Sequence, residues 1–122
     1  MAMNILVVED EKKIAAFIRK GLDEQGYSLT ISHNGDEGYR LAQTKSFDLI
    51  ILDIMLPKLD GFEVLSRLRQ GKQSKDIPII MLTASGEAKH IKAGMDKGAD
   101  AYLAKPFKST VLLGIIKGLL GK

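Results

Sequence analysis

Polar side chains that can bind metal ions and phosphate follow the apolar, strand-like runs of this sequence. Glu9 and Asp10 follow the first run, Asp53 the third, Thr83 the fourth and Lys105 the fifth. A carboxylate at the end of a buried strand is unfavourable unless something requires it there. Because ligands of open parallel α/β sheets bind outside the carboxyl ends of the strands, we expect these five side chains to gather at one edge.

The three carboxylates of this predicted cluster belong to Glu9, Asp10 and Asp53, and they would repel one another. A hard divalent cation relieves such repulsion most simply. Oxygen ligands without histidine or cysteine favour Mg²⁺, Mn²⁺ or Ca²⁺ over zinc. We therefore expect Mg²⁺, with Mn²⁺ as a substitute. Glu9 and Asp10 would hold the metal, and Asp53 would be a further ligand.

The same residues predict phosphoryl chemistry. A carboxylate can attack phosphorus and form an aspartyl phosphate. The transferring group carries negative charge on its equatorial oxygens, so catalysis is mainly positioning and electrostatic neutralisation. The ammonium of Lys105 and the hydroxyl of Thr83 would bind two of those oxygens. We therefore interpret Asp53 as the residue that receives the phosphoryl group.

The elements that must position these side chains alternate between strand and helix. Apolar strand-like runs lie at 4–8, 27–32, 48–52, 77–82 and 100–104. Three of them are almost continuously apolar, which is typical of strands covered on both faces. Segments with helical spacing separate the runs, and apolar residues of the first and last such segments recur every three or four positions. This alternation predicts a doubly wound parallel α/β sheet.

Composition is that of one ordinary cytosolic domain. The chain has 122 residues, 45% hydrophobic content and no cysteine. It contains neither a membrane-length apolar stretch nor a signal peptide, so we expect a cytoplasmic protein with no membrane partner. The net charge of +3 is uneven, because the second half is basic. The basic residues are scattered without interleaved aromatics, so we expect a solvated surface and no direct nucleic-acid binding.

Four motifs together resemble response-regulator receiver domains, the CheY-like phosphoacceptor modules of two-component signalling. The motifs are ILVVEDE, DLIILDIMLPKLDGFEVL, IPIIMLTA and GADAYLAKPF, in this order. The resemblance covers the chain from Asn4 to about Leu120, and its N-terminal part is most like the receivers of winged-helix transcription regulators. It implies a flavodoxin-like, five-stranded sheet of order 2-1-3-4-5 with helices on both faces. Residues 1–122 would form a single receiver domain, with no effector domain in this chain.

The resemblance also implies a mechanism. Asp53 would accept a phosphoryl group from a sensor histidine kinase, a phosphotransfer protein or a small donor such as acetyl phosphate. The backbone carbonyl of Met55 would be a further Mg²⁺ ligand, and the Lys105–Pro106 bond would be cis. The domain is not an enzyme in the ordinary sense, because it would catalyse its own phosphorylation and slow autodephosphorylation.

A switch is implied by the same resemblance. Phosphorylation would draw Thr83 inward, and Tyr102 would turn from an outward to an inward rotamer. The surface made by the fourth helix, the fifth strand and the fifth helix would then change partners. Tyr102 also has a plainer interpretation as an ordinary half-buried aromatic residue.

The last helical segment departs from the receivers of winged-helix regulators. Position 101 is Ala where an acidic residue is common, and STVLLGIIKGLLGK lacks the usual arginines and acids. Its apolar residues cover an arc of about 200°, roughly twice what docking on a sheet needs. Either the fourth helix covers one flank, or that flank is exposed and binds a partner. A homodimer through this apolar helix is one hypothesis.

Other functions are open on the residues alone. A protein-interaction domain of the same fold without phosphotransfer is the main alternative. An aspartyl-phosphate phosphohydrolase usually has a second aspartate two residues after the nucleophile, where this chain has Met55. Glu9 has the alternative role of a turn or capping residue. We expect Asp60-Gly61 to be a turn and helix cap, and His33 and His90 to lie on the surface.

Overall fold

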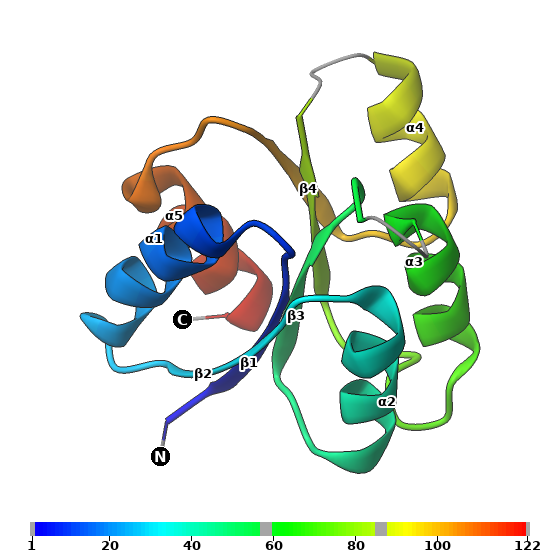
Figure 1. Cartoon of the computed structure of the whole chain (residues 1–122), viewed down its shortest axis with the longest axis horizontal. Coiled ribbons are helices and arrows are strands. Elements are labelled where there is room, and N and C mark those ends of the chain that lie inside the picture. Colours follow the sequence, from blue (N-terminus) through cyan, green and yellow to red (C-terminus); the bar gives the residue numbers. More distant parts are fainter. Residues whose placement is uncertain (1, 57–59, 85–87, 122) are drawn as a thin grey trace.

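The structure, a computed structural model, describes residues 2–56, 60–84 and 88–121. Within these residues, strands and helices alternate along the whole chain (Figure 1). The elements are β1 (Asn4–Val8), α1 (Lys12–Asp23), β2 (Ser28–Ser32), α2 (Gly35–Thr44), β3 (Leu49–Asp53), α3 (Gly61–Gln70), β4 (Ile79–Thr83), α4 (Ala88–Asp96), β5 (Ala101–Ala104) and α5 (Ser109–Leu120). The strands are parallel in the order β2-β1-β3-β4-β5, which confirms the predicted fold.

Aliphatic runs form the centre of the sheet. Every residue of β3 and of β4 is buried, as are four of the five residues of β1. Strands covered on both faces need apolar side chains in both directions, which explains their unbroken aliphatic sequences. The predicted fourth strand began at position 77, whereas β4 begins at Ile79. Pro78 has no N–H to donate to the ladder, although its carbonyl accepts from the Ile50 N–H at 2.9 Å.

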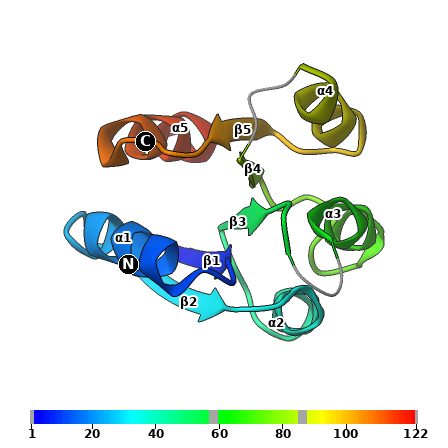
Figure 2. The ribbon, with the colours of Figure 1, turned by 45° about the horizontal axis from the view of Figure 1, so that its top comes forward.

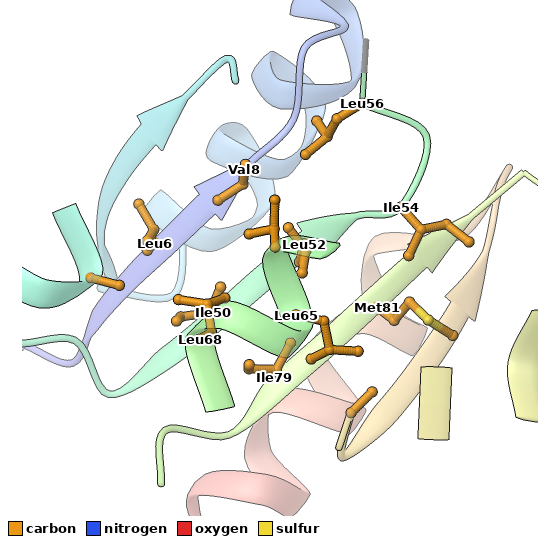
Figure 3. Close-up of a cluster of buried hydrophobic side chains, with 13 residues drawn as sticks. Leu6, Val8, Ile50, Leu52, Ile54, Leu56, Leu65, Leu68, Ile79 and Met81 are labelled. Atoms are coloured by element: carbon orange, nitrogen blue, oxygen red, sulfur yellow. The ribbon is translucent and has the colours of Figure 1, made fainter. Parts of the chain in front are cut away.

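Helices cover both faces of the sheet. Figure 2 shows α1 and α5 on one face and α2, α3 and α4 on the other. Each face has its own apolar cluster, because alternate residues of a strand point to opposite sides. Figure 3 shows the cluster under α2 and α3, in which Leu6, Ile50 and Met81 of the strands meet Leu65 and Leu68 of α3.

The helix α3 begins beside the carboxyl end of β3. Asp60 is its N-cap, and the Asp60 side chain accepts a hydrogen bond from the Glu63 N–H at 3.0 Å. The expectation of a helix cap at Asp60 is therefore confirmed. The cap satisfies one of the N–H groups that a helix terminus leaves without an intrahelical partner.

The apolar helix α5 is buried along only part of its surface. Leu112 and Ile116 are buried against the sheet, whereas the Val111 side chain is 48% exposed. The sequence left open whether the fourth helix covers one flank of this helix or whether that flank is exposed. At Val111 the flank is exposed. No helix in the described ranges is both long and apolar enough to span a membrane.

Candidate functional site

The three acidic residues singled out in the sequence meet at the carboxyl ends of β1 and β3. Carboxylate oxygens of Glu9, Asp10 and Asp53 all lie within 4.8 Å of one another. Glu9 and Asp53 are buried, whereas Asp10 is exposed. Pairing of Val8 with Leu52 places the two strand ends side by side and so brings the carboxylates together. These three residues form the acidic cluster.

Backbone N–H groups orient the two buried carboxylates. Oδ1 of Asp53 accepts a hydrogen bond from the Met55 N–H at 2.9 Å. Oε2 of Glu9 accepts one from the Glu11 N–H at 3.1 Å. In both residues the loop that follows the strand turns back to bind the side chain, so each carboxylate has one oxygen held by its own loop.

Lys105 contacts the other oxygen of each buried carboxylate. Its Nζ lies 2.9 Å from Oε1 of Glu9 and 3.3 Å from Oδ2 of Asp53. The backbone N–H of Lys105 donates to the Thr83 carbonyl at 2.8 Å, which extends the pairing of β4 with β5 to the site. The Lys105–Pro106 peptide bond is cis.

Burial and neighbouring charge shift the proton affinities of this site. The pKa of Glu9 is raised to about 7, mainly by burial and also by the nearby Asp53 carboxylate, against the opposing effect of the Lys105 hydrogen bond. Burial acts to lower the pKa of Lys105. The hydrogen bond to Glu9 and the charge of Asp53 outweigh it, so the pKa of Lys105 is raised. Two buried anions therefore share one cation.

Thr83 and Tyr102 lie on the same face of the sheet. Tyr102 pairs with Met81, and Thr83 follows Met81 by two residues on β4. Because strand side chains alternate, Thr83 and Tyr102 project to the side that α4 covers. Thr83 is buried, whereas Tyr102 is 44% exposed. Ser85, two residues after Thr83, lies outside the described residues.

The structure adds two residues that the sequence reasoning did not assign to the site. His33 is on the surface as expected, but its Nδ1 lies 2.9 Å from the backbone carbonyl of Glu9 and donates to it. The sequence signal for this contact was that His33 directly follows the second strand, which pairs with β1. Gly61 contacts the backbone of Asp53 and Ile54, and no sequence pattern pointed to that contact.

The donor set suits a hard divalent cation. The cluster consists of carboxylates, and oxygen ligands are those that Mg²⁺ and Mn²⁺ prefer. The raised pKa of Glu9 reflects an anion that lacks sufficient compensation from Lys105 alone. A buried, oriented carboxylate beside an ammonium is also a suitable nucleophile for a phosphoryl group.

Comparison with known families and sequences agrees with this chemistry. Residues 5–117 match the family described as "Response regulator receiver domain". The transcriptional regulatory protein CusR of Escherichia coli K12 is 46% identical over 118 residues, which are 97% of this chain and 51% of that protein. The uncharacterized transcriptional regulatory protein YkoG of Bacillus subtilis is 45% identical over 96% of this chain and 50% of its own length. The chain thus spans about half the length of these relatives.

Solved structures give the same result. The receiver domain of the sensor histidine kinase PA1611 from Pseudomonas aeruginosa, solved with a magnesium ion in its active-site cleft, has a TM-score of 0.93 at 32% identity. That similarity covers the whole of both chains. The chemotaxis protein CheY4 of Vibrio cholerae also has a TM-score of 0.93 at 32% identity, over 98% of this chain and 100% of its own.

Proposed function

The chain belongs to the response regulator receiver domain family, and we propose that Asp53 is the residue on which it accepts a phosphoryl group. The observation that carries this assignment is the pair of ion contacts from Lys105 to Glu9 and Asp53, both buried carboxylates. Of these two carboxylates, that of Asp53 belongs to the last residue of β3, the middle strand of the sheet. An interaction domain without phosphotransfer would not need two buried carboxylates at this edge.

The proposed step is an in-line phosphoryl transfer. Asp53 forms a new P–O bond while the P–N bond of a phosphohistidine breaks, and the imidazole nitrogen keeps the bonding electron pair. The Met55 N–H holds Oδ1 of Asp53 at 2.9 Å, so the carboxylate is oriented before the donor arrives. Lys105 and the Thr83 hydroxyl then bind the phosphoryl oxygens.

Mg²⁺ is the proposed cofactor, and Mn²⁺ is its substitute. Glu9, Asp10, Asp53 and the backbone carbonyl of Met55 would hold it, and the carboxylates supply an all-oxygen cluster. When bound, the cation neutralises the acidic cluster and the charge of the phosphoryl group. The magnesium-bound receiver of PA1611 supports this assignment by similarity.

Thr83 and Tyr102 form the proposed switch. Both side chains project to the α4 side of the sheet, on neighbouring strands. If Thr83 moves toward a phosphorylated Asp53, it vacates space on that side, and the exposed Tyr102 ring turns into it. The surface formed by α4, β5 and α5, which adjoin at one end of the sheet (Figure 2), would then change its partners.

The proposed partners are a sensor histidine kinase or phosphotransfer protein as donor, and a second copy of this chain. Met95 of α4, Tyr102 of β5 and Val111 of α5 are exposed apolar residues on adjoining elements, which supports a homodimer through that surface. The relatives' names support a role in transcriptional regulation for a longer protein that contains this domain. The proposed location is the cytoplasm.

The test is intact-protein mass after incubation with acetyl phosphate and Mg²⁺. We expect one phosphoryl adduct on the unmodified chain, and none on Asp53→Ala or when EDTA replaces Mg²⁺. A phosphorylated histidine kinase should give the same adduct. If the unmodified chain binds Mg²⁺ without forming an adduct from either donor, the phosphorylation-independent interaction domain becomes the better assignment.

A further inference from the structure

Gly61 lies directly on the backbone of the acceptor strand. It is the first residue of α3, and its N–H donates to the Ile54 carbonyl at 3.0 Å. A Cβ at this position would overlap Ile54 Cα and lie 2.5 Å from the carbonyl oxygen of Asp53. These neighbours are backbone atoms, so no side-chain rotation can relieve the overlap.

The requirement at Gly61 is for space and not for an unusual conformation. Among the described glycines, positive φ angles occur at Gly26, Gly98 and Gly121. Gly61 instead begins an ordinary helix, where alanine has the higher intrinsic propensity. The absence of a side chain at position 61 is therefore explained by the close approach of the helix to the strand.

The backbone that Gly61 contacts orients the acceptor carboxylate. Ile54 is buried, and its N–H donates to the Leu82 carbonyl of β4 at 3.0 Å. The segment after Asp53 is thus held by β4 through the Ile54 N–H and by α3 through the Ile54 carbonyl. The next N–H, that of Met55, donates to Oδ1 of Asp53. A shift of this backbone would move both the Asp53 carboxylate and the Met55 carbonyl.

We propose that Gly61 is a positioning residue for phosphoryl transfer: its missing side chain lets the first turn of α3 hold the Asp53–Met55 backbone in the orientation that binds Mg²⁺ and receives the phosphoryl group. This inference rests on the proposed function. It also gives Gly61 a role beyond the turn and helix cap that the sequence indicates.

Gly61→Ala tests the proposal against two matched controls. Gly38→Ala also overpacks a buried helix position, because its Cβ would lie 2.7 Å from Val8 Cγ2, but that contact is with a side chain that can move and not with the backbone of Asp53 or Ile54. Gly114→Ala adds a methyl group to α5 with nothing within 4 Å. For each variant, circular dichroism checks folding, calorimetry gives the Mg²⁺ dissociation constant, and intact mass gives the phosphorylation rate with acetyl phosphate.

We expect Gly61→Ala to weaken Mg²⁺ binding and to slow phosphorylation by about tenfold or more, since a displaced carboxylate and carbonyl affect both. Gly38→Ala should lose stability yet stay within about twofold of the unmodified chain in both measurements, and Gly114→Ala should match the unmodified chain. A folded Gly61→Ala variant with unchanged binding and rate would overturn the proposal. Equal losses in Gly38→Ala would also overturn it, because they would indicate general destabilisation.

If Gly61→Ala does not fold, amide hydrogen exchange in the unmodified chain tests the proposed role of Gly61. In the unmodified chain, saturating Mg²⁺ should slow exchange of the Gly61 and Met55 amides together, whereas the Glu37 amide, capped by Asn34 in α2, should change less than twofold. If Mg²⁺ slows exchange of the Met55 amide but leaves the exchange rate of the Gly61 amide unchanged, the proposal is overturned. If the unmodified chain neither binds Mg²⁺ nor accepts a phosphoryl group, the proposed function fails and the Gly61 proposal falls with it.

Discussion

The ammonium of Lys105 lies 2.9 Å from the carboxylate of Glu9, a residue with no exposed surface, and it also contacts Asp53 at 3.3 Å. One cation therefore compensates two buried anions in the structure. A divalent cation would bind to the same carboxylates, so Lys105 and Mg²⁺ compete electrostatically for them. Three properties of the protein should follow from this arrangement: its pH-dependent stability, its metal affinity and its phosphorylation rate.

Metal-free stability should contain a component that falls as pH rises from about 5 to about 7. The pKa of Glu9 is about 7 in the folded chain against 4.5 for an unperturbed glutamate, so the folded state binds more protons in this window. Deprotonation at higher pH then favours unfolding, by an amount on the order of 2 kcal/mol. Urea unfolding in EDTA at pH 5, 6 and 7.5 measures it.

Glu9→Gln is the control for this pH dependence. The amide cannot ionise, so the stability of the unmodified chain relative to Glu9→Gln should decrease between pH 5 and 7.5 and level off above that range. Saturating Mg²⁺ should reverse the decrease at pH 7.5 by stabilising the ionised carboxylate. Parallel pH profiles for the two proteins would show that Glu9 titrates normally.

Lys105→Met should separate metal binding from phosphoryl transfer. Without the ammonium, the repulsion against Mg²⁺ disappears, and the Mg²⁺ dissociation constant should fall roughly tenfold. Phosphorylation by acetyl phosphate should slow by about tenfold or more, because one phosphoryl oxygen loses its cationic partner. Calorimetry and intact-mass kinetics at pH 7.5 measure the two effects, and Lys108→Met is the matched control on the adjacent exposed surface. Weaker Mg²⁺ binding in Lys105→Met would contradict the competition.

The sequence was sufficient for the parts of the fold and site that depend on periodicity and strand ends. The unbroken aliphatic runs predicted β1, β3 and β4 to within two residues. Since parallel strands end at a common edge, the ends of the first, third and fifth runs also predicted that Glu9, Asp53 and Lys105 lie together. The contact of Gly61 with the Asp53 backbone depends on the distance between α3 and β3, which no local pattern encodes.

Long-range side-chain anchors were also absent from the sequence reasoning. Arg69 donates to the Gly98 carbonyl at 2.9 Å and to the Ile77 carbonyl at 2.6 Å, and it pairs with Asp100 at 2.7 Å. These bonds tie the end of α3 to the segments before β4 and β5. The local sequence does not distinguish this arginine from an exposed surface charge, because its partners lie up to 31 residues away in the sequence.

Arg69→Met should therefore destabilise the fold at the edge opposite the acidic cluster. We expect a loss of about 2–3 kcal/mol in the free energy of unfolding, because Asp100 and four backbone carbonyls lose a charged donor. Arg67→Met is the matched control: its pair with Glu63 at 3.2 Å is exposed, and the loss should be under about 1 kcal/mol. Urea unfolding measures the free energy of unfolding of both variants. Equal losses would mean that the Arg69 contacts contribute no more to stability than the exposed Arg67 pair.

Val111→Asp should abolish the proposed homodimer without affecting phosphorylation. Val111 lies on the exposed flank of α5, and burying a carboxylate in an apolar contact is strongly unfavourable. Ala16→Asp is a suitable control, because it adds a carboxylate at another exposed apolar position, but on α1. Sedimentation velocity with Mg²⁺ and acetyl phosphate should show dimers for the unmodified chain and Ala16→Asp, and monomers for Val111→Asp. Monomers of all three at about 100 μM, well above a micromolar dissociation constant, would mean that the exposed flank does not pair with itself.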